Sequence, residues 1–149
     1  KMRSIQDTFR EDGVVVVKNV LSPDSIREAR QGLHETLFTK AGVSAENLEE
    51  TGGGLASLSS TGGAGGVLDI FYPPWKLKLL EDARMWDVVT SLWEASYAAG
   101  DDPIFAHTFG PFDPHRGYAY VDRLCFRVPD RISDLHSAGG GSGSGRGRG

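Results

Sequence analysis

Apolar residues recur along the chain with two different spacings, and each spacing predicts one kind of element. From Pro23 to about Lys40 they recur at steps of three and four, as they do on one face of a helix. Ser22 precedes this segment and can cap free backbone amides, while Pro23 supplies a helical φ at the first position. We therefore predict a helix here and a shorter one over residues 2–10, with an apolar stripe on the longer helix made of Ile26, Ala29, Leu33 and Leu37.

A second apolar face with helical spacing lies between Asp82, which is suited to an N-cap, and Ala98. A short helical turn over residues 75–80 is expected before it, after the pair Pro73-Pro74. We interpret the face as ordinary core, with stacking on a cofactor as the alternative; its members are Met85, Val88, Val89, Leu92, Trp93 and Tyr97.

Other segments carry strand signals. Val14 to Lys18 is a run of β-branched residues after an Asp-Gly turn, which is typical of a strand covered on both faces. Residues 67–73 should be extended, and Gly117 to Pro129 alternates between two faces as a longer strand does. Because helices come early and strand signals dominate late, the chain fits an α+β protein whose β core lies further on.

Two stretches are rich in glycine and poor in large apolar residues. We interpret residues 41–66 as a flexible insert, either poorly ordered or a flap over a substrate cleft. Residues 137–149 form a Gly/Ser/Arg tail that we expect to be disordered. The tail has too few arginines to predict RNA binding, and the glycines of the insert lack the lysine of a phosphate-binding loop.

Charge and cysteine content narrow the possible partners. The net charge is −4, so no overall basic field attracts nucleic acid or an anionic membrane. No apolar run is long enough to span a membrane and no targeting leader is visible, so we expect a cytoplasmic protein, although a start upstream of Lys1 remains open. Cys125 is the only cysteine; we expect a buried, reduced thiol, with a His-partnered nucleophile as the alternative.

One segment resembles a known protein family. Its sequence pattern, from Phe9 onward, is F-x-x-D-G-V-V-V-V-K-N-V-L-S-P-D-S-I. It resembles the N-terminal part of the phytanoyl-CoA dioxygenase-like proteins, which are iron(II)- and 2-oxoglutarate-dependent oxygenases. The resemblance continues weakly into LDIFYPPWKLKLLEDARMWDVVTSLW and GYAYVDRLCFRVPD. It implies a partial domain over residues 1–136, in which N-terminal helices pack on an incomplete double-stranded β-helix (jelly-roll) sheet, followed by the tail.

The resemblance also implies a metal site. The family holds iron(II) with two histidines and one carboxylate, beginning with His-x-Asp or His-x-Glu after a strand. No histidine of this chain has an acid two residues later, and His136 lies about where a first ligand is expected. The resemblance further places the strand that contains Tyr120, Arg123 and Arg127 near the co-substrate. Arginine suits the carboxylates of 2-oxoglutarate, and the alternative is that these arginines pair with acids or face solvent.

Other polar residues give weaker predictions of a functional site. The set His107, Asp113 and His115 offers two imidazoles and a carboxylate, but prolines interrupt the segment, and loop residues in solvent are the alternative. His34 is expected on a solvated helix face. Asp69 and Asp122 are expected to be sheet-surface carboxylates rather than an acid–base pair.

Three hypotheses for function follow. The chain is an oxygenase-family member, whose complete relatives would hydroxylate a small organic substrate, but it stops or diverges before its metal site. Alternatively it is a non-catalytic binding or interaction module of the same fold. The third hypothesis is a truncation product whose unpaired sheet edge favours self-association.

Overall fold

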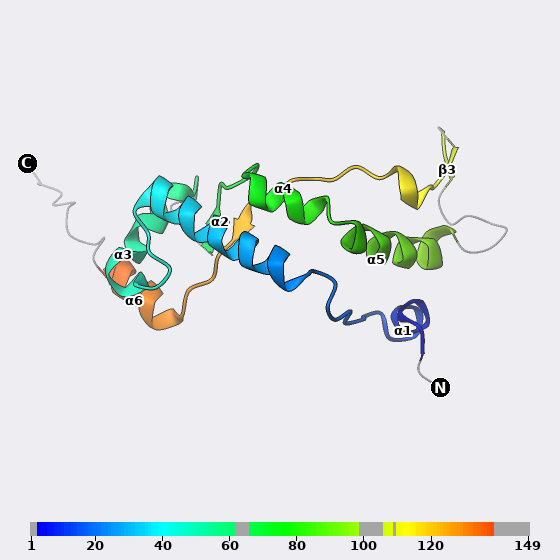
Figure 1. Cartoon of the computed structure of the whole chain (residues 1–149), viewed down its shortest axis with the longest axis horizontal. Helices are drawn as coiled ribbons and strands as arrows, with labels where there is room; N and C mark the ends of the chain where they lie inside the picture. Colours follow the sequence, from blue (N-terminus) through cyan, green and yellow to red (C-terminus); the bar gives the residue numbers. More distant parts are fainter. Residues whose placement is uncertain (1–2, 62–65, 99–105, 109, 139–149) are drawn as a thin grey trace, which may run out of the picture. The chain divides into compact units, whose positions relative to one another are not determined.

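A computed structural model of the chain describes residues 3–61, 66–98, 106–108 and 110–138 (Figure 1). Helices predominate, and the described strands form two short antiparallel pairs, so the class is α+β, as predicted. The strand β1 (Val67–Leu68) pairs with β4 (Leu124–Cys125), and β2 (Ala106–His107) pairs with β3 (Gly110–Pro111).

The chain divides into two compact units, and neither is continuous in sequence. Unit 1 comprises Lys1–Ala29 and Pro74–Tyr120, and unit 2 comprises Arg30–Pro73 and Val121–Gly149. The chain therefore passes from one unit to the other three times.

The predicted helices of unit 1 are confirmed. These elements are α1 (Ile5–Asp12), the first part of α2 (Pro23–Ala41), α4 (Pro74–Leu80), α5 (Ala83–Trp93) and its π-helical continuation η3 (Glu94–Ala98). The short η4 (Pro114–Arg116) also belongs to unit 1 and was not predicted. Side-chain caps lie at the N-termini of α2 and α5, at the residues that the sequence predicts. Ser22 Oγ accepts from the amide of Ser25 at 3.0 Å, and Asp82 accepts from the amides of Arg84 and Met85.

The apolar face of α5 and η3 packs against the segment that follows it. The ring of Phe112 makes edge-on contacts with Trp93 and Tyr97, at centroid distances of 6.2 and 5.8 Å. A Cβ on Gly117 would lie 3.3 Å from both Trp86 and Trp93, so the backbone at this glycine sits directly against two indole rings. The predicted core face is therefore packed but only half-buried, and Tyr97 remains 40% exposed.

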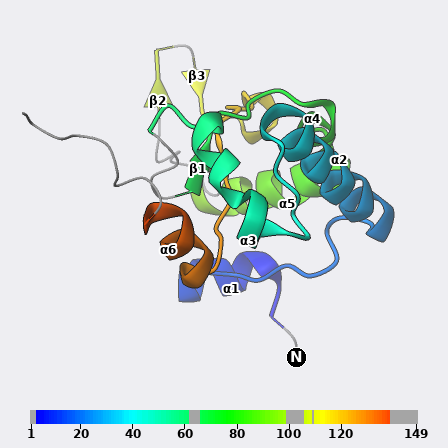
Figure 2. The ribbon, with the colours of Figure 1, turned by 90° about the vertical axis from the view of Figure 1, so that its left-hand side faces the viewer.

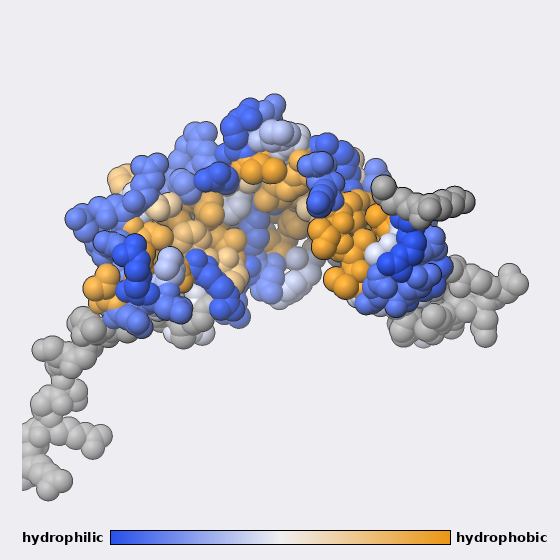
Figure 3. Space-filling model, turned by 90° about the horizontal axis from the view of Figure 1, so that it is seen from below, coloured by the Kyte–Doolittle hydropathy of each residue, from blue (hydrophilic) through white to orange (hydrophobic). Residues whose placement is uncertain are grey.

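The predicted strand at Val14 to Lys18 is wrong. The segment has no strand partner among the described residues, and Val14 and Val16 are 64% and 79% exposed. A β-branched run favours extended backbone, but a strand also requires a neighbour to accept its hydrogen bonds, and the local sequence does not specify one. Val14 and Val16 are therefore open to water, while Val15 and Val17 are half-buried. Figure 3 shows that apolar surface also occurs between polar patches on the face of the molecule that it presents.

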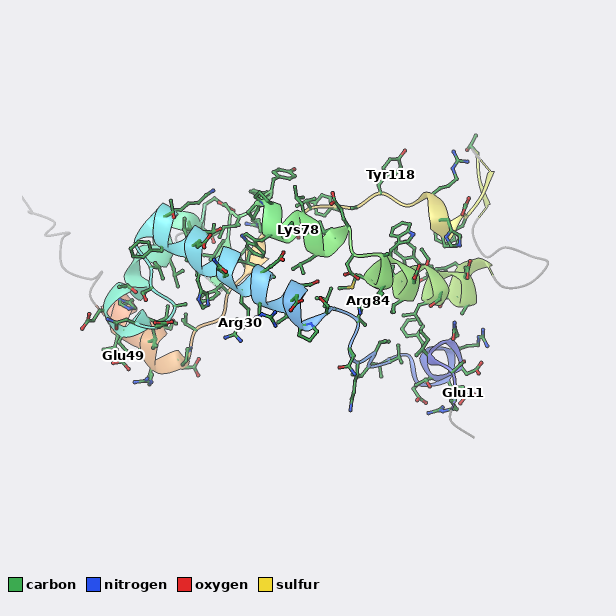
Figure 4. The ribbon with its side chains drawn as sticks, viewed as in Figure 1. Glu11, Arg30, Glu49, Lys78, Arg84 and Tyr118 are labelled. Carbon is green, nitrogen blue, oxygen red and sulfur yellow. The ribbon has the colours of Figure 1, made fainter. Side chains whose placement is uncertain are left out.

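The predicted long strand at Gly117 to Pro129 is mostly wrong for the same reason. Within the part of the chain that the structure describes, only Leu124–Cys125 of this segment pairs with another strand, and the side chains of Tyr118 and Tyr120 are 99% and 83% exposed. Figure 4 shows Tyr118 projecting away from the chain.

Among the described residues, the buried aliphatic side chains lie in unit 2. They belong to the second part of α2, the turn after it, β1 and the residue pair beyond it, and α6: Leu37, Val43, Leu68, Ile70 and Ile132. The predicted helix to about Lys40 is confirmed, since α2 ends at Ala41. Gly42 follows in the left-handed conformation (φ 65°), and its amide donates to the carbonyl of Phe38 at 2.8 Å, which is a common way to end a helix.

Two short helices lie within residues 41–66, the segment expected as a flexible insert. These are α3 (Leu48–Thr51) and the 3-10 helix η1 (Gly52–Leu58), while residues 62–65 lie outside the described residues. Thr51 fixes the preceding loop, because its hydroxyl accepts from the amide of Ser44 at 3.0 Å and donates to the carbonyl of Asn47 at 2.6 Å.

A last helix, α6 (Asp130–Ala138), was not predicted. It includes the first two residues of the expected tail, and residues 139–149 lie outside the described residues. Figure 2 shows α6 beside α3, and the two elements are in contact.

Candidate functional site

A pocket of about 360 Å³ opens within unit 2. Its walls come from η1, from Gly66 and β1, from the segment after β4, and from α6. The polar side chains on these walls are those of Arg127, Asp130, Ser133 and His136, and the larger apolar ones are those of Leu55, Leu68, Phe126, Val128 and Ile132.

His136 is held in place at the pocket by the backbone of α3 and η1. Its Nε2 lies 2.9 Å from the carbonyl oxygen of Leu48. A carbonyl only accepts, so Nε2 carries the proton, and Nδ1 holds the lone pair when the ring is neutral. No described residue donates to that Nδ1 atom.

Two glycines allow the imidazole to lie against η1. A Cβ on Gly52 would be 2.9 Å from Nε2 of His136, and a Cβ on Gly53 would be 3.2 Å from Nδ1. Sequence reasoning missed this contact because it treated the glycine-rich segment only as an insert. The signal available was a run of three glycines, Gly52 to Gly54, which marks close approach of other atoms to the backbone as well as flexibility.

Arg127 is the cation on the pocket wall. Its guanidinium makes no ion pair or hydrogen bond with any described residue. Asp130 adds a carboxylate to the same wall, so the two unlike charges line one cavity. This arrangement favours a ligand that presents an anionic group to Arg127 and a hydrogen-bond donor to Asp130.

The other two residues expected near the co-substrate are placed elsewhere. Arg123 lies 3.9 Å from Asp69, measured from Nη1 to Oδ1, and this pair is partly exposed. Tyr120 belongs to unit 1 and is exposed. Of the expected set, the pocket therefore brings together Arg127 and His136.

The aspartates singled out on the strands have local structural partners. Asp69 Oδ2 accepts from the amide of Ser60 at 2.7 Å, and Asp122 Oδ1 accepts from the amide of Arg123 at 2.7 Å. Both carboxylates thus satisfy nearby backbone amides.

The described residues do not fit an iron(II) centre. They contain no group of three or more His, Cys, Asp or Glu side chains arranged to hold a metal ion. On the pocket wall His136 and Asp130 supply two donor side chains, one fewer than the family's triad.

The cluster around His115 forms its own local contacts. Asp113 accepts from the amide of His115 at 2.9 Å, and His115 Nε2 lies 2.7 Å from Oε1 of Glu94. Both His115 and Glu94 are exposed, and the side chain of His107 lies outside the described residues. His34 is half-buried on α2.

Cys125 is exposed, so its predicted burial is wrong. It lies opposite Val67 in the β1–β4 pair, where Leu124 is half-buried and Cys125 faces solvent. The apolar neighbours Leu124 and Phe126 suggested burial, but adjacent strand residues point to opposite faces.

The chain matches no family model, no curated protein and no solved structure. The family resemblance therefore stays a prediction that rests on its sequence text. Among the described helices, none combines the length and apolar character needed to cross a membrane.

Proposed function

We propose that this chain is a phytanoyl-CoA dioxygenase-like protein in which unit 2 acts as a non-catalytic binding module for a small carboxylate. The observation that carries the proposal is Arg127, a guanidinium without an ion-pair partner among the described residues, on the wall of the pocket that His136 also lines.

The chemistry of the pocket supports a ligand of this class. Guanidinium binds a carboxylate through two parallel hydrogen bonds, and this geometry is specific for planar anions. The cavity of about 360 Å³ is at the small end of ligand pockets, which suits a molecule the size of 2-oxoglutarate.

The proposal also includes the type of β-sheet to which the β1–β4 pair belongs. We infer that the β1–β4 pair is the beginning of a jelly-roll sheet, because a jelly roll pairs antiparallel strands that are distant in sequence. Val67 opposite Cys125 and Leu68 opposite Leu124 are such a pair.

Hydroxylation of a small organic substrate by iron(II) and 2-oxoglutarate is the activity that the resemblance implies for complete relatives. The described residues supply too few donors for the metal, so no reaction step is derived through it. Binding of the carboxylate needs only Arg127 and its surroundings.

The test is a calorimetric titration of 2-oxoglutarate into metal-free protein, which measures the affinity directly. Arg127→Gln should weaken binding about tenfold or more, the loss expected for one charge-assisted interaction. Arg30→Gln is the matched control, because Arg30 is exposed on α2 (Figure 4) and is not among the residues of the pocket wall.

Equal affinity in all three proteins, or no binding to the unaltered chain at millimolar 2-oxoglutarate, would overturn the proposal. Iron(II) is then added and succinate is measured. Succinate release that depends on the protein would show turnover and contradict the non-catalytic assignment.

A further inference from the structure

An unpaired, strand-like segment of unit 1 lies between two left-handed residues. Gly13 (φ 72°) ends α1, Asn19 (φ 58°) begins the next turn, and Val14 to Lys18 runs between them. These five residues make no backbone–backbone hydrogen bond with any described residue. The backbone groups of the segment and the exposed side chains of Val14 and Val16 are thus available to a partner strand, while Val15 and Val17 are half-buried.

We propose that this segment pairs with the same segment of a second copy of the chain, antiparallel and with Val15 on the two-fold axis. In that register Val15 lies opposite the partner's Val15, and Val14 lies opposite the partner's Val16. The ladder ends at the left-handed Gly13, and Lys18 then comes close to the partner's Asp12, the last residue of α1. The exposed valines of both copies then share one face of the new ribbon.

Charge complementarity argues for this occupant and this register. Glu11 and Asp12 both bind Arg3, at 2.6 and 2.7 Å, and Arg10 in the same last turn pairs with Asp7 at 3.4 Å. Two carboxylates therefore share the single guanidinium of Arg3, and this cluster has one negative charge in excess. Lys18, at the other end of the segment, is exposed and has no ion-pair partner among the described residues.

An acidic end, four valines and a basic end make the segment self-complementary when it is reversed. A foreign strand would have to supply the same pattern of charges, whereas a second copy supplies it by symmetry. Because an isolated two-stranded ribbon is only marginally stable in water, the association should be weak and concentration-dependent.

Disulfide mapping tests the register. In a Cys125→Ser background, Val15→Cys places two thiols directly opposite each other, with Cα atoms about 5 Å apart, within disulfide range. Val16→Cys is the matched control, because its two copies would be diagonal neighbours about 7 to 8 Å apart, beyond that range.

Under mild oxidation at high chain concentration, the Val15→Cys protein should give about five-fold more covalent dimer than the Val16→Cys protein. Equal yields, or no dimer with either, would overturn the proposal. Products larger than a dimer in the unoxidised protein would also overturn it, because two-fold pairing is closed.

A charge exchange keeps the test independent of cysteine chemistry. Lys18→Glu and Asp12→Lys should each weaken self-association in sedimentation equilibrium, and an equimolar mixture of the two should recover it as a heterodimer. A mixture that associates no better than either variant alone would contradict the Lys18–Asp12 contact. Circular dichroism of each variant confirms that α1 is retained. The segment Val14 to Lys18 lies in unit 1, so the result of the self-association tests is independent of the result of the 2-oxoglutarate titration at the pocket in unit 2.

Discussion

His136 donates a hydrogen bond through Nε2 to the carbonyl oxygen of Leu48, 2.9 Å away, and so joins α6 to α3. A second link runs in parallel, since Arg131 on α6 forms an ion pair with Glu49 on α3. The ion pair is exposed and contributes little, whereas the histidine is half-buried against Gly52 and Gly53. Of these two polar links, the histidine contact is therefore the one that contributes more to the docking of α6.

Replacing His136 with alanine should lower the free energy of unfolding by about 1 to 2 kcal/mol, because the change removes both the hydrogen bond and the ring that covers the glycines. Urea denaturation measures the difference. His34→Ala is the control, since His34 makes no hydrogen bond with the described residues, and its effect should be smaller. Equal losses in the two variants would mean that the Leu48 contact contributes nothing specific.

Gly54 should not tolerate a side chain. A Cβ at this position would lie 2.4 Å from the carbonyl oxygen of Ala41 and 2.8 Å from Cγ2 of Val43, and the first of these atoms belongs to the backbone. Gly54→Ala should therefore destabilise the protein by about 1 to 3 kcal/mol. Ala56→Ser, at an exposed position of the same helix, should cost far less in the same thermal unfolding experiment. A Gly54→Ala protein with unchanged thermal stability would contradict this close approach.

Asp82 should be the cap that fixes the start of α5. Asp82→Ala removes the acceptor for the amides of Arg84 and Met85, and should cost about 1 kcal/mol. Hydrogen exchange at those two amides should become faster, and Asp82→Asn should restore protection because asparagine caps equally well. Asp87→Ala, at an exposed position further along α5, is the control and should leave both amides protected.

Cys125 should react with an aromatic disulfide reagent in the native protein at nearly the rate of the unfolded chain, because its side chain is exposed. Absorbance should report one thiol per chain without denaturant. A thiol that reacts only after denaturant is added would contradict the exposed placement at β4.

The helices were predictable because their signals are local. The caps at Ser22 and Asp82 and the apolar spacing that follows each of them lie within a few turns of sequence, and α2 and α5 form where these signals indicate. Strands depend on a partner, so the β-branched run at Val14 to Lys18 gave the wrong element, while the pairing of Val67 with Cys125 had no local signal. The helix α6 was missed because its segment is short and its burial rests chiefly on Ile132.

The candidate site was predictable only in part. Arg127 and His136 were both named from the sequence, but through a family resemblance that says nothing of their common pocket. Their meeting depends on the close approach of His136 to Gly52, a contact between residues far apart along the chain. Tyr120 shares the strand signal of Arg127 but lies in the other unit, because the chain leaves unit 1 directly after it.

The three passages of the chain between its units have a consequence for biosynthesis. Unit 1 is complete only when Tyr120 has been made, and unit 2 must wait for α6. A ribosome that has translated the first half of the message thus holds pieces of both units and the whole of neither. Cleavage between Pro73 and Pro74 would likewise leave two fragments that each contain parts of both, so neither unit can be expressed as one uninterrupted stretch of the gene.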